Sequence, residues 1–246
     1  MRSTTLLGLI LGFGTIYLVI IADGSLAYFA NWEAFVIVSM GTISALTIYF
    51  TPYSLATSFK ILFRLFTERQ ISDANLVELM VHLSRKARRV GFIELFQTTK
   101  GIGIPFLEKG LMLLADGIEK DTIEDILVQE SETIYAEHKI AERFFRTGGS
   151  FSPLFGILGT VMGLISMLHN IQNPQAIPAA MGLALVTTFY GLIFSALFFK
   201  PIAGKIHNKN ESEFQKRKII SEAILSIQKG ENSQRIKERL TTFALN

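Results

Sequence analysis

The sequence contains no cysteine, so neither a disulfide framework nor a thiolate metal site is possible. Charge is also scarce, because Asp, Glu, Lys and Arg make up 18% of the 246 residues, whereas a soluble domain usually carries about 25%. A spanning helix needs about 20 mostly apolar residues. Four stretches without any charged residue can each supply one: 3–22, 34–59, 147–168 and 170–199. The composition therefore predicts a multi-pass membrane protein.

Lysine and arginine are missing from two connectors, residues 23–33 and 169–176. All 24 basic residues lie at Arg2, between 60 and 146, or from 200 onward. The positive-inside rule then predicts that both termini and the middle segment are cytoplasmic and that the two connectors are external. The first apolar stretch is long for a signal-peptide core and lacks an A-x-A-like cleavage site, so we expect it to remain as a span. The predicted spans are 4–22, 34–52, 148–168 and 177–199.

Sequence signatures of enzymes are missing as well. The four histidines, at 82, 138, 169 and 207, have no metal-ligand spacing. Gly101-Ile102-Gly103 is half of a phosphate-binding loop, without a third glycine or a preceding strand, and neither G-x-x-x-x-G-K-[ST] nor G-x-S-x-G is present. The basic residues flank membrane segments, so orientation explains the net charge of +3 better than nucleic-acid binding does. We therefore expect no enzyme activity, no cofactor and no nucleic-acid partner.

The polar middle segment, about 53–147, has helical rather than strand periodicity. Ser72 or Asp73 can cap a helix, and Pro105 lies near the start of another. A third helix opens at Lys120 and is expected to run into the third span, loosened at Gly148-Gly149. The apolar stripe of the first of these helices is Leu76, Leu79, Met80 and Leu83, at steps of three and four residues. The tail after Pro201 also reads as helix, with Ile206, Ile220, Ile224 and Ile227 as its apolar positions.

The predicted fold is thus an all-α membrane protein with four transmembrane helices, a helical cytoplasmic domain between spans 2 and 3, and a helical C-terminal tail. We expect four parts: an N-terminal transmembrane hairpin at 1–52, a cytoplasmic helical domain at 53–147, spans 3 and 4 at 148–200, and a basic cytoplasmic tail at 201–246.

None of the predicted spans has Asp, Glu, Lys or Arg in its interior. Ion pathways through bilayers normally need an ionisable group near the middle, so either this chain conducts nothing or a partner supplies the carboxylate. Small residues instead share one face of each of the last two spans, where they allow helix backbones to approach closely. These residues are Gly156, Gly159, Thr160, Gly163 and Ser166 in the third span, and Ala184, Thr188, Gly191 and Ser195, with Thr187 beside them, in the fourth.

The threonines and prolines of these two spans have two interpretations each. A membrane threonine can return its hydroxyl to its own helix, or it can offer oxygen to a partly dehydrated cation; Thr160, Thr187 and Thr188 are the candidates for the second role. Pro153 begins the third predicted span and Pro201 ends the fourth, as ordinary start and stop signals do. The alternative for both prolines is a hinge near the cytoplasmic mouth.

Several separated motifs occur in a fixed order. Residues 152–165 read SPLFGILGTVMGLI, residues 184–191 read ALVTTFYG after Ala176-Ile177-Pro178, and Pro201-Ile202-Ala203 follows. Residues 105–111 read PFLEKGL, and Asp116-Gly117 comes shortly after. With the two-plus-two layout of spans, these motifs resemble the MotA/PomA stator family of the flagellar motor over essentially the whole chain. ExbB and TolQ share the logic of the last spans but usually have three, so the N-terminal hairpin favours the flagellar branch.

The resemblance implies a function in the bacterial inner membrane. Five copies of such a subunit surround two copies of a MotB/PomB-like subunit, whose single span brings an essential aspartate. Ion passage there drives rotation of the pentamer and torque on a FliG-like rotor switch protein. Thr160, Thr187 and Thr188 match positions that line the ion path, and threonine at the Thr160 position favours Na⁺ over H⁺. Pro153 and Pro201 match prolines that couple ion flow to movement.

Two positions depart from the family pattern. Arg88 and Arg89 match its basic rotor-facing site, but the usual glutamate that follows falls on Phe96, with Glu94 two residues earlier. A two-residue shift turns a side chain about 160° around an α-helix, so the rotor contact formed with Glu94 is expected to differ. An acidic residue common before the third span is Ser150 here. These departures keep an ExbB/TolQ-like subunit powering another envelope process as the alternative; a carrier is disfavoured because no inverted repeat is visible.

Overall fold

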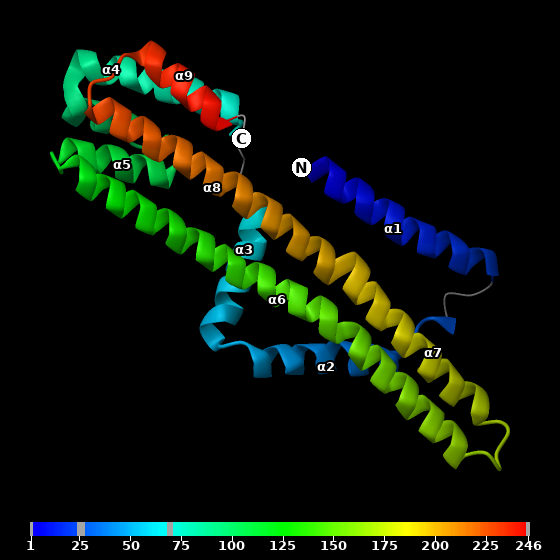
Figure 1. The fold of residues 1–246 in the computed structure, drawn as a ribbon. Coiled ribbons are helices and arrows are strands. Elements are labelled where there is room, and N and C mark those ends of the chain that lie inside the picture. Colours follow the sequence, from blue (N-terminus) through cyan, green and yellow to red (C-terminus); the bar gives the residue numbers. More distant parts are fainter. Residues whose placement is uncertain (1, 24–27, 68–70, 245–246) are drawn as a thin grey trace. The chain divides into compact units, whose positions relative to one another are not determined.

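The computed structural model has an all-helical architecture (Figure 1). It describes residues 2–23, 28–67 and 71–244, and no strand occurs among these residues. The chain divides into two units. We call Met1–Thr67 with Lys139–His207 the apolar unit, and Glu68–His138 with Asn208–Asn246 the polar unit. Two long helices, α6 (Lys120–His169) and α8 (Lys200–Gln228), contribute residues to both.

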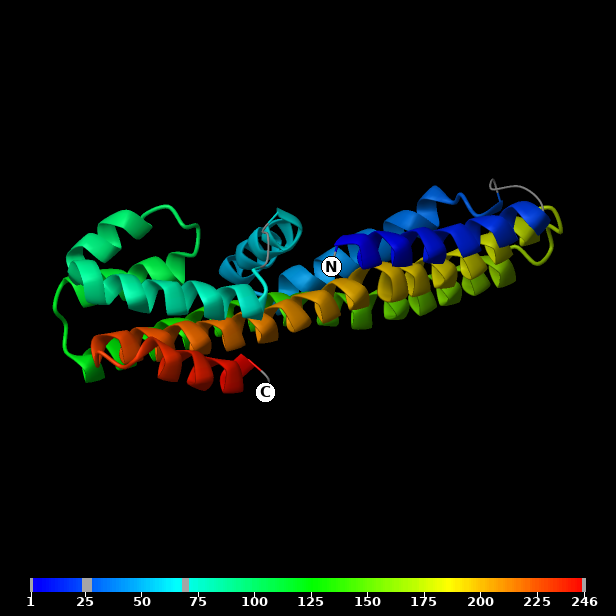
Figure 2. The ribbon, with the colours of Figure 1, turned by 90° about the horizontal axis from the view of Figure 1, so that it is seen from above.

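The apolar unit contains α1 (Arg2–Asp23), α2 (Trp32–Tyr49), α3 (Pro52–Thr67), the second part of α6, α7 (Ile177–Ile193), a π-helix η2 (Phe194–Phe199) and the start of α8. Figure 2 shows α6 and α7 running side by side in this unit. Asn31 caps α2, because its side chain accepts a hydrogen bond from the Ala34 N–H at 2.9 Å. A buried cluster that includes Phe144, Phe145 and Ile206 joins α6 to α8.

Three helical runs among the described residues are long and apolar enough to cross a membrane: Trp32–Tyr49, Lys120–His169 and Ile177–Gln228. The described part of α1 adds a shorter apolar helix, Ile10–Ala22. The all-helical class is therefore confirmed, whereas the count of four spans and their orientation stay predictions.

The polar unit is built from α4 (Asp73–Thr99), α5 (Pro105–Ala115), the first part of α6, the rest of α8, and α9 (Ser233–Ala244). Ser72 caps α4 and Pro105 opens α5, as their sequence positions predict. Helix α4 packs against α5 and α9, and the predicted stripes line one core except at Ile206, which belongs to the buried cluster of the apolar unit. Its members include Leu76, Met80 and Leu83 of α4, Leu107 and Leu111 of α5, Ile123 and Leu127 of α6, and Ile220, Ile224 and Ile227 of α8.

The structure corrects the predicted helix ends at both prolines. Helix α6 is continuous for 50 residues with Pro153 inside it, so Pro153 does not begin a helix. Pro201 lies in the first turn of α8, directly after the π-helix, so it does not end one. A proline inside a helix removes one hydrogen bond to the residue four positions back and crowds that carbonyl. A wide π turn before Pro201 relieves this crowding, while the Gly149 carbonyl four residues before Pro153 accepts a hydrogen bond from the Ser195 side chain.

Candidate functional site

Small residues let α6 and α7 pack with their backbones in close contact. A methyl group built on Gly163 would lie 2.8 Å from the Ala180 carbonyl oxygen and from the Ala184 Cβ, and one on Gly191 would lie 2.7 Å from the Ser152 carbonyl oxygen. Only glycine fits such approaches. The close-packing interpretation is confirmed at Gly156, Gly159, Gly163 and Gly191, whereas Ser166 of the same predicted face is exposed. This seam positions the threonines.

Thr160 and Thr188 meet across the seam. Their hydroxyl groups contact each other directly, and Thr160 Oγ1 also lies 3.1 Å from the carbonyl oxygens of Gly156 and Ala184. Both threonines are half-buried. A hydroxyl has one proton and two lone pairs, so this group of four oxygens has more acceptor capacity than its protons can satisfy. Oxygen-rich, uncharged groups of this kind suit a hard cation.

Thr187 occupies a different environment from the other two. It is fully buried, its hydroxyl donates to the Ala184 carbonyl at 2.9 Å, and its methyl side fills the space above Gly159. The structure therefore brings Thr160 and Thr188 together and links Thr187 to them only through the shared Ala184 carbonyl.

The stretch of α6 around Pro153 packs against α7 and the π-helix η2 in the apolar unit. Gly191 of α7 packs directly on Pro153, since a methyl group on Gly191 would lie 3.2 Å from the Pro153 Cα. Ser195, which the sequence assigns only to a small-residue face, donates its hydroxyl to the Gly149 carbonyl of α6 at 2.6 Å. Ser195 and Gly149 are 46 residues apart, so no local sequence pattern predicts this hydrogen bond.

The predicted rotor-facing residues lie on α4, where Gly91 adopts a φ of 78° and breaks the helical register. Arg88 and Arg89 before the break and Glu94 after it are all exposed. Arg88 donates to the Gly230 carbonyl at 2.8 Å. Because glycine alone adopts this φ without strain, the two arginines and Glu94 do not share one continuous helical face.

Phe96, at the position of the expected glutamate, contributes to the core of the polar unit. Its half-buried ring packs against the buried cluster there, and the Lys100 ammonium lies 5.0 Å from the ring centroid. Ser150 is exposed and donates to the Arg146 carbonyl of its own helix at 3.3 Å. Both departures from the family pattern therefore have local structural roles.

A charged cluster around Glu142 was not predicted from the sequence. Glu142 of α6 is 6% exposed and accepts hydrogen bonds from Arg146 at 2.6 Å and from His207 of α8 at 3.1 Å, with the Lys139 ammonium 3.5 Å away. Burial raises the pKa of Glu142, but the hydrogen bonds from Arg146 and His207 and the charge of Lys139 outweigh it and hold the pKa below its ordinary value. The spacing of Lys139, Glu142 and Arg146 was the available signal.

The half phosphate loop serves another purpose in the structure. The N–H groups of Gly101 and Gly103 both donate to Oε1 of Glu108, at 3.1 and 3.3 Å. The anion that this loop binds is thus a carboxylate of the same chain, which closes the loop onto α5. Among the residues that the structure describes, no group of three or more His, Cys, Asp or Glu could hold a metal ion.

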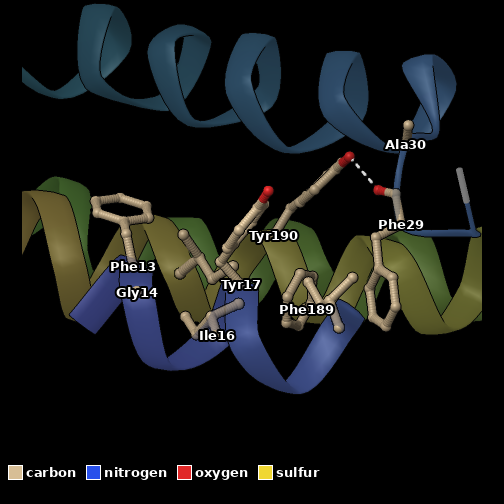
Figure 3. A pocket seen from close by; sticks show the side chains of 10 residues that line it. Phe13, Gly14, Ile16, Tyr17, Phe29, Ala30, Phe189 and Tyr190 are labelled. Carbon is tan, nitrogen blue, oxygen red and sulfur yellow. Dashed lines mark hydrogen bonds between the residues drawn. The ribbon is translucent and has the colours of Figure 1, made fainter. Parts of the chain in front are cut away.

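An open pocket of about 590 Å³ is lined by residues of α1, α7 and the segment before α2, and neither Thr160 nor Thr188 lines it (Figure 3). Phe13 and Tyr17 of α1 and Phe189 of α7 line it, and the Tyr190 hydroxyl at its edge donates to the Phe29 carbonyl. The lining residues include no carboxylate and no basic group, so this pocket suits apolar material rather than an ion.

Sequence comparisons relate the chain to known membrane proteins of ion transport and motility. The MotA/TolQ/ExbB proton channel family matches residues 99–219. The chemotaxis protein PomA of Vibrio alginolyticus is 32% identical over 243 residues, which cover 99% of this chain and 95% of the relative. The uncharacterized protein YtxD of Bacillus subtilis is also 32% identical, with coverage of 98% and 89%.

The fold is also similar to solved structures of flagellar stator complexes. The flagellar MotAB stator complex from Bacillus subtilis matches with a TM-score of 0.85 at 30% identity, covering 95% of this chain and 92% of that chain. C. jejuni MotAB matches with a TM-score of 0.90 at 24% identity, covering 99% and 96%, and shows the likeness of the fold.

The sequence and fold define a membrane-embedded subunit of the proton channel family, a family of ion transport rather than of enzymes. Within it, the chain belongs to the MotA/PomA family of flagellar stator subunits.

Proposed function

We propose that this chain is the A subunit of an ion-driven flagellar stator, which couples ion flow across the bacterial inner membrane to torque on the flagellar rotor. The observation that carries the proposal is the Thr160–Thr188 oxygen group, held by close packing of α6 and α7 in helices that the family comparisons identify as those of a stator subunit. The complex that this chain forms with its partner transports an ion without catalysing a reaction and without a cofactor.

The ion path is shared with a partner subunit. The predicted spans carry no interior carboxylate, and the solved relatives are complexes named MotAB. We propose that a dimer of a MotB/PomB-like single-span subunit supplies the titrating aspartate and that five copies of this chain surround it. In this arrangement the chain has four spans, with both termini and the polar unit in the cytoplasm beside a FliG-like rotor protein.

The proposed roles of single residues are those that the resemblance to stator subunits implies. Thr160 and Thr188 line the ion path, and Thr187 supports them from behind through the Ala184 carbonyl. Pro153 and Pro201 form the coupling hinge, while Arg88, Arg89 and Glu94 contact the rotor. Sodium is the proposed ion, because the Thr160 hydroxyl adds an oxygen ligand that an alanine at this position would lack.

Rotation measured with sodium replaced by potassium at fixed pH tests this function. The assay uses cells that hold this chain and its partner as their sole stator. We expect rotation to stop in potassium and to return when sodium is restored. Rotation that persists in potassium but stops when the proton gradient is collapsed would contradict the choice of sodium; absence of rotation under every condition would contradict the stator function.

Phe96 favours a second candidate, an ExbB/TolQ-like subunit that powers another envelope process, because its ring takes the place of a rotor-facing carboxylate. The neighbouring gene distinguishes the two. A single span with an aspartate followed by a peptidoglycan-binding domain agrees with the stator, whereas a periplasmic domain without that wall anchor agrees with the alternative.

A further inference from the structure

A buried carbonyl in α6 lacks its usual partner because of a proline. In an α-helix each carbonyl accepts a hydrogen bond from the N–H four residues later. The residue four positions after Gly149 is Pro153, which has no N–H. A buried carbonyl left without a donor is strongly unfavourable. The Ser195 hydroxyl supplies the missing donor from the neighbouring segment at 2.6 Å, and Ser195 itself is 3% exposed.

Gly148 and Gly149 pack tightly against the segment that contains Ser195. A methyl group on Gly149 would lie 3.0 Å from the Lys200 Cγ and 3.3 Å from the Phe199 Cβ, and one on Gly148 would lie 2.4 Å from the Phe199 ring. Gly191 packs on Pro153 from the same side. The stretch of α6 that ends at Pro153 therefore rests directly on α7 and η2.

Ser195 also belongs to the irregular turn before the other proline. Its carbonyl accepts the N–H of Lys200, five residues later, which is the π-type bond that widens η2. Lys200 immediately precedes Pro201. One residue thus bonds through its side chain to the irregularity at Pro153 and through its backbone to the irregularity at Pro201.

We propose that Ser195 is a positioning residue that links the two proline-bearing segments, so that they move together when ion passage is coupled to rotation. The proposal rests on the stator function proposed above. In it, Ser195 touches neither the ion nor the rotor; it replaces the backbone hydrogen bond that Pro153 removes. A serine retained only for its small size would predict the opposite, namely that alanine works equally well.

A double-mutant cycle with Pro153 tests the link. Pro153→Ala restores an N–H that can reach the Gly149 carbonyl, so the Ser195 hydroxyl becomes redundant. We expect Ser195→Ala to lower the thermal midpoint of the purified complex with its partner by about 2–4 °C, and to add no further loss in the Pro153→Ala background. Equal losses in both backgrounds, or no loss in either, would overturn the proposal.

A second measurement separates coupling from stability. Ser195→Ala should slow rotation at a given load while ion conductance through the assembled complex stays near that of the unmodified complex. An equal loss of both would overturn the proposal, because it marks a general defect. Ser152→Ala is the matched control: Ser152 is fully buried beside Pro153, but its hydroxyl has no partner among the described residues, so its removal should not lower the midpoint. Rotation by the unmodified complex tests the stator function separately.

Discussion

At the scale of single residues, Thr160 and Thr188 differ from Thr187 in what their oxygens can still bind. Thr187 is fully buried, and its hydroxyl donates a hydrogen bond to the Ala184 carbonyl. Thr160 and Thr188 are half-buried and lie against each other and two carbonyls, with more lone pairs than protons. A cation that replaces part of its hydration shell with these oxygens needs only small movements of the side chains.

Thr160→Ala should therefore weaken ion use while the complex still assembles. Loss of one oxygen ligand is worth about 1–2 kcal/mol, so the sodium concentration for half-maximal rotation should rise about tenfold. Thr160→Ser should keep the wild-type concentration. Thr15→Ala is a matched control, because the exposed Thr15 hydroxyl donates to the Leu11 carbonyl of its own helix, at 2.7 Å. Unchanged sodium dependence of Thr160→Ala would rule out the ligand role.

Glu142 gives a prediction of pH dependence at the same scale. The pKa of Glu142 is lower in the folded chain than in the unfolded chain. Its interactions therefore stabilise the fold at pH values above the ordinary carboxyl pKa, and this stabilisation is lost as the pH falls through the lowered pKa. Glu142→Gln should cost about 1–2 kcal/mol at pH 7, and the cost should vanish in acid. Thermal unfolding from pH 3 to pH 8 measures it.

Glu124→Gln is the control for this charge change. Glu124 is half-exposed in a pair with Lys120 on the same helix, so little change is expected at any pH. A Glu142→Gln variant that is equally destabilised at pH 3 and pH 7 would mean that packing, rather than charge, explains its effect.

At the scale of helices, the seam between α6 and α7 depends on backbone contact. Gly163→Ala should destabilise the assembled subunit, because its methyl group would meet the Ala180 carbonyl and the Ala184 backbone N at 2.8 Å, and overpacking of this kind costs about 1–3 kcal/mol. Gly182→Ala in α7 should be tolerated, since nothing lies within 4 Å of the added methyl group. The amount and thermal midpoint of the purified complex measure both variants; equal behaviour would contradict the role of the seam.

The predictability of each element depends on how local its causes are. The Ser72 cap, the start of α5 at Pro105 and the stripe that includes Leu76 and Met80 were predictable, because each depends on residues a few positions apart. The Glu142–His207 and Ser195–Gly149 hydrogen bonds were not, because they join residues 65 and 46 positions apart. The helix ends predicted at the prolines were wrong for the same reason, because the hydrogen bond that compensates for Pro153 inside α6 comes from Ser195, which is distant in sequence.

At the scale of the whole molecule, the proposed ion path needs a titrating group that the predicted spans of this chain do not contain. The predicted spans carry no Asp, Glu, Lys or Arg in their interior, and ion pathways through bilayers normally need an ionisable group near the middle. We expect liposomes containing this chain alone to show no sodium or proton flux, and flux to appear when the partner is co-reconstituted. Flux through the chain alone would contradict the division of roles between the two subunits.

The π-helix at Phe194–Phe199 has a consequence for tolerance of deletions. An α-helix turns about 100° per residue, so loss of one residue from the regular part of α7 would rotate everything after it away from its contacts with Gly149 and Pro153. Loss of one residue inside the wide turn would instead convert it to ordinary α-helix, with both flanking helices keeping their faces. Phe194–Phe199 is therefore a place where the chain can become one residue shorter without losing its alignment, at the expense of the relief that the wide turn gives Pro201.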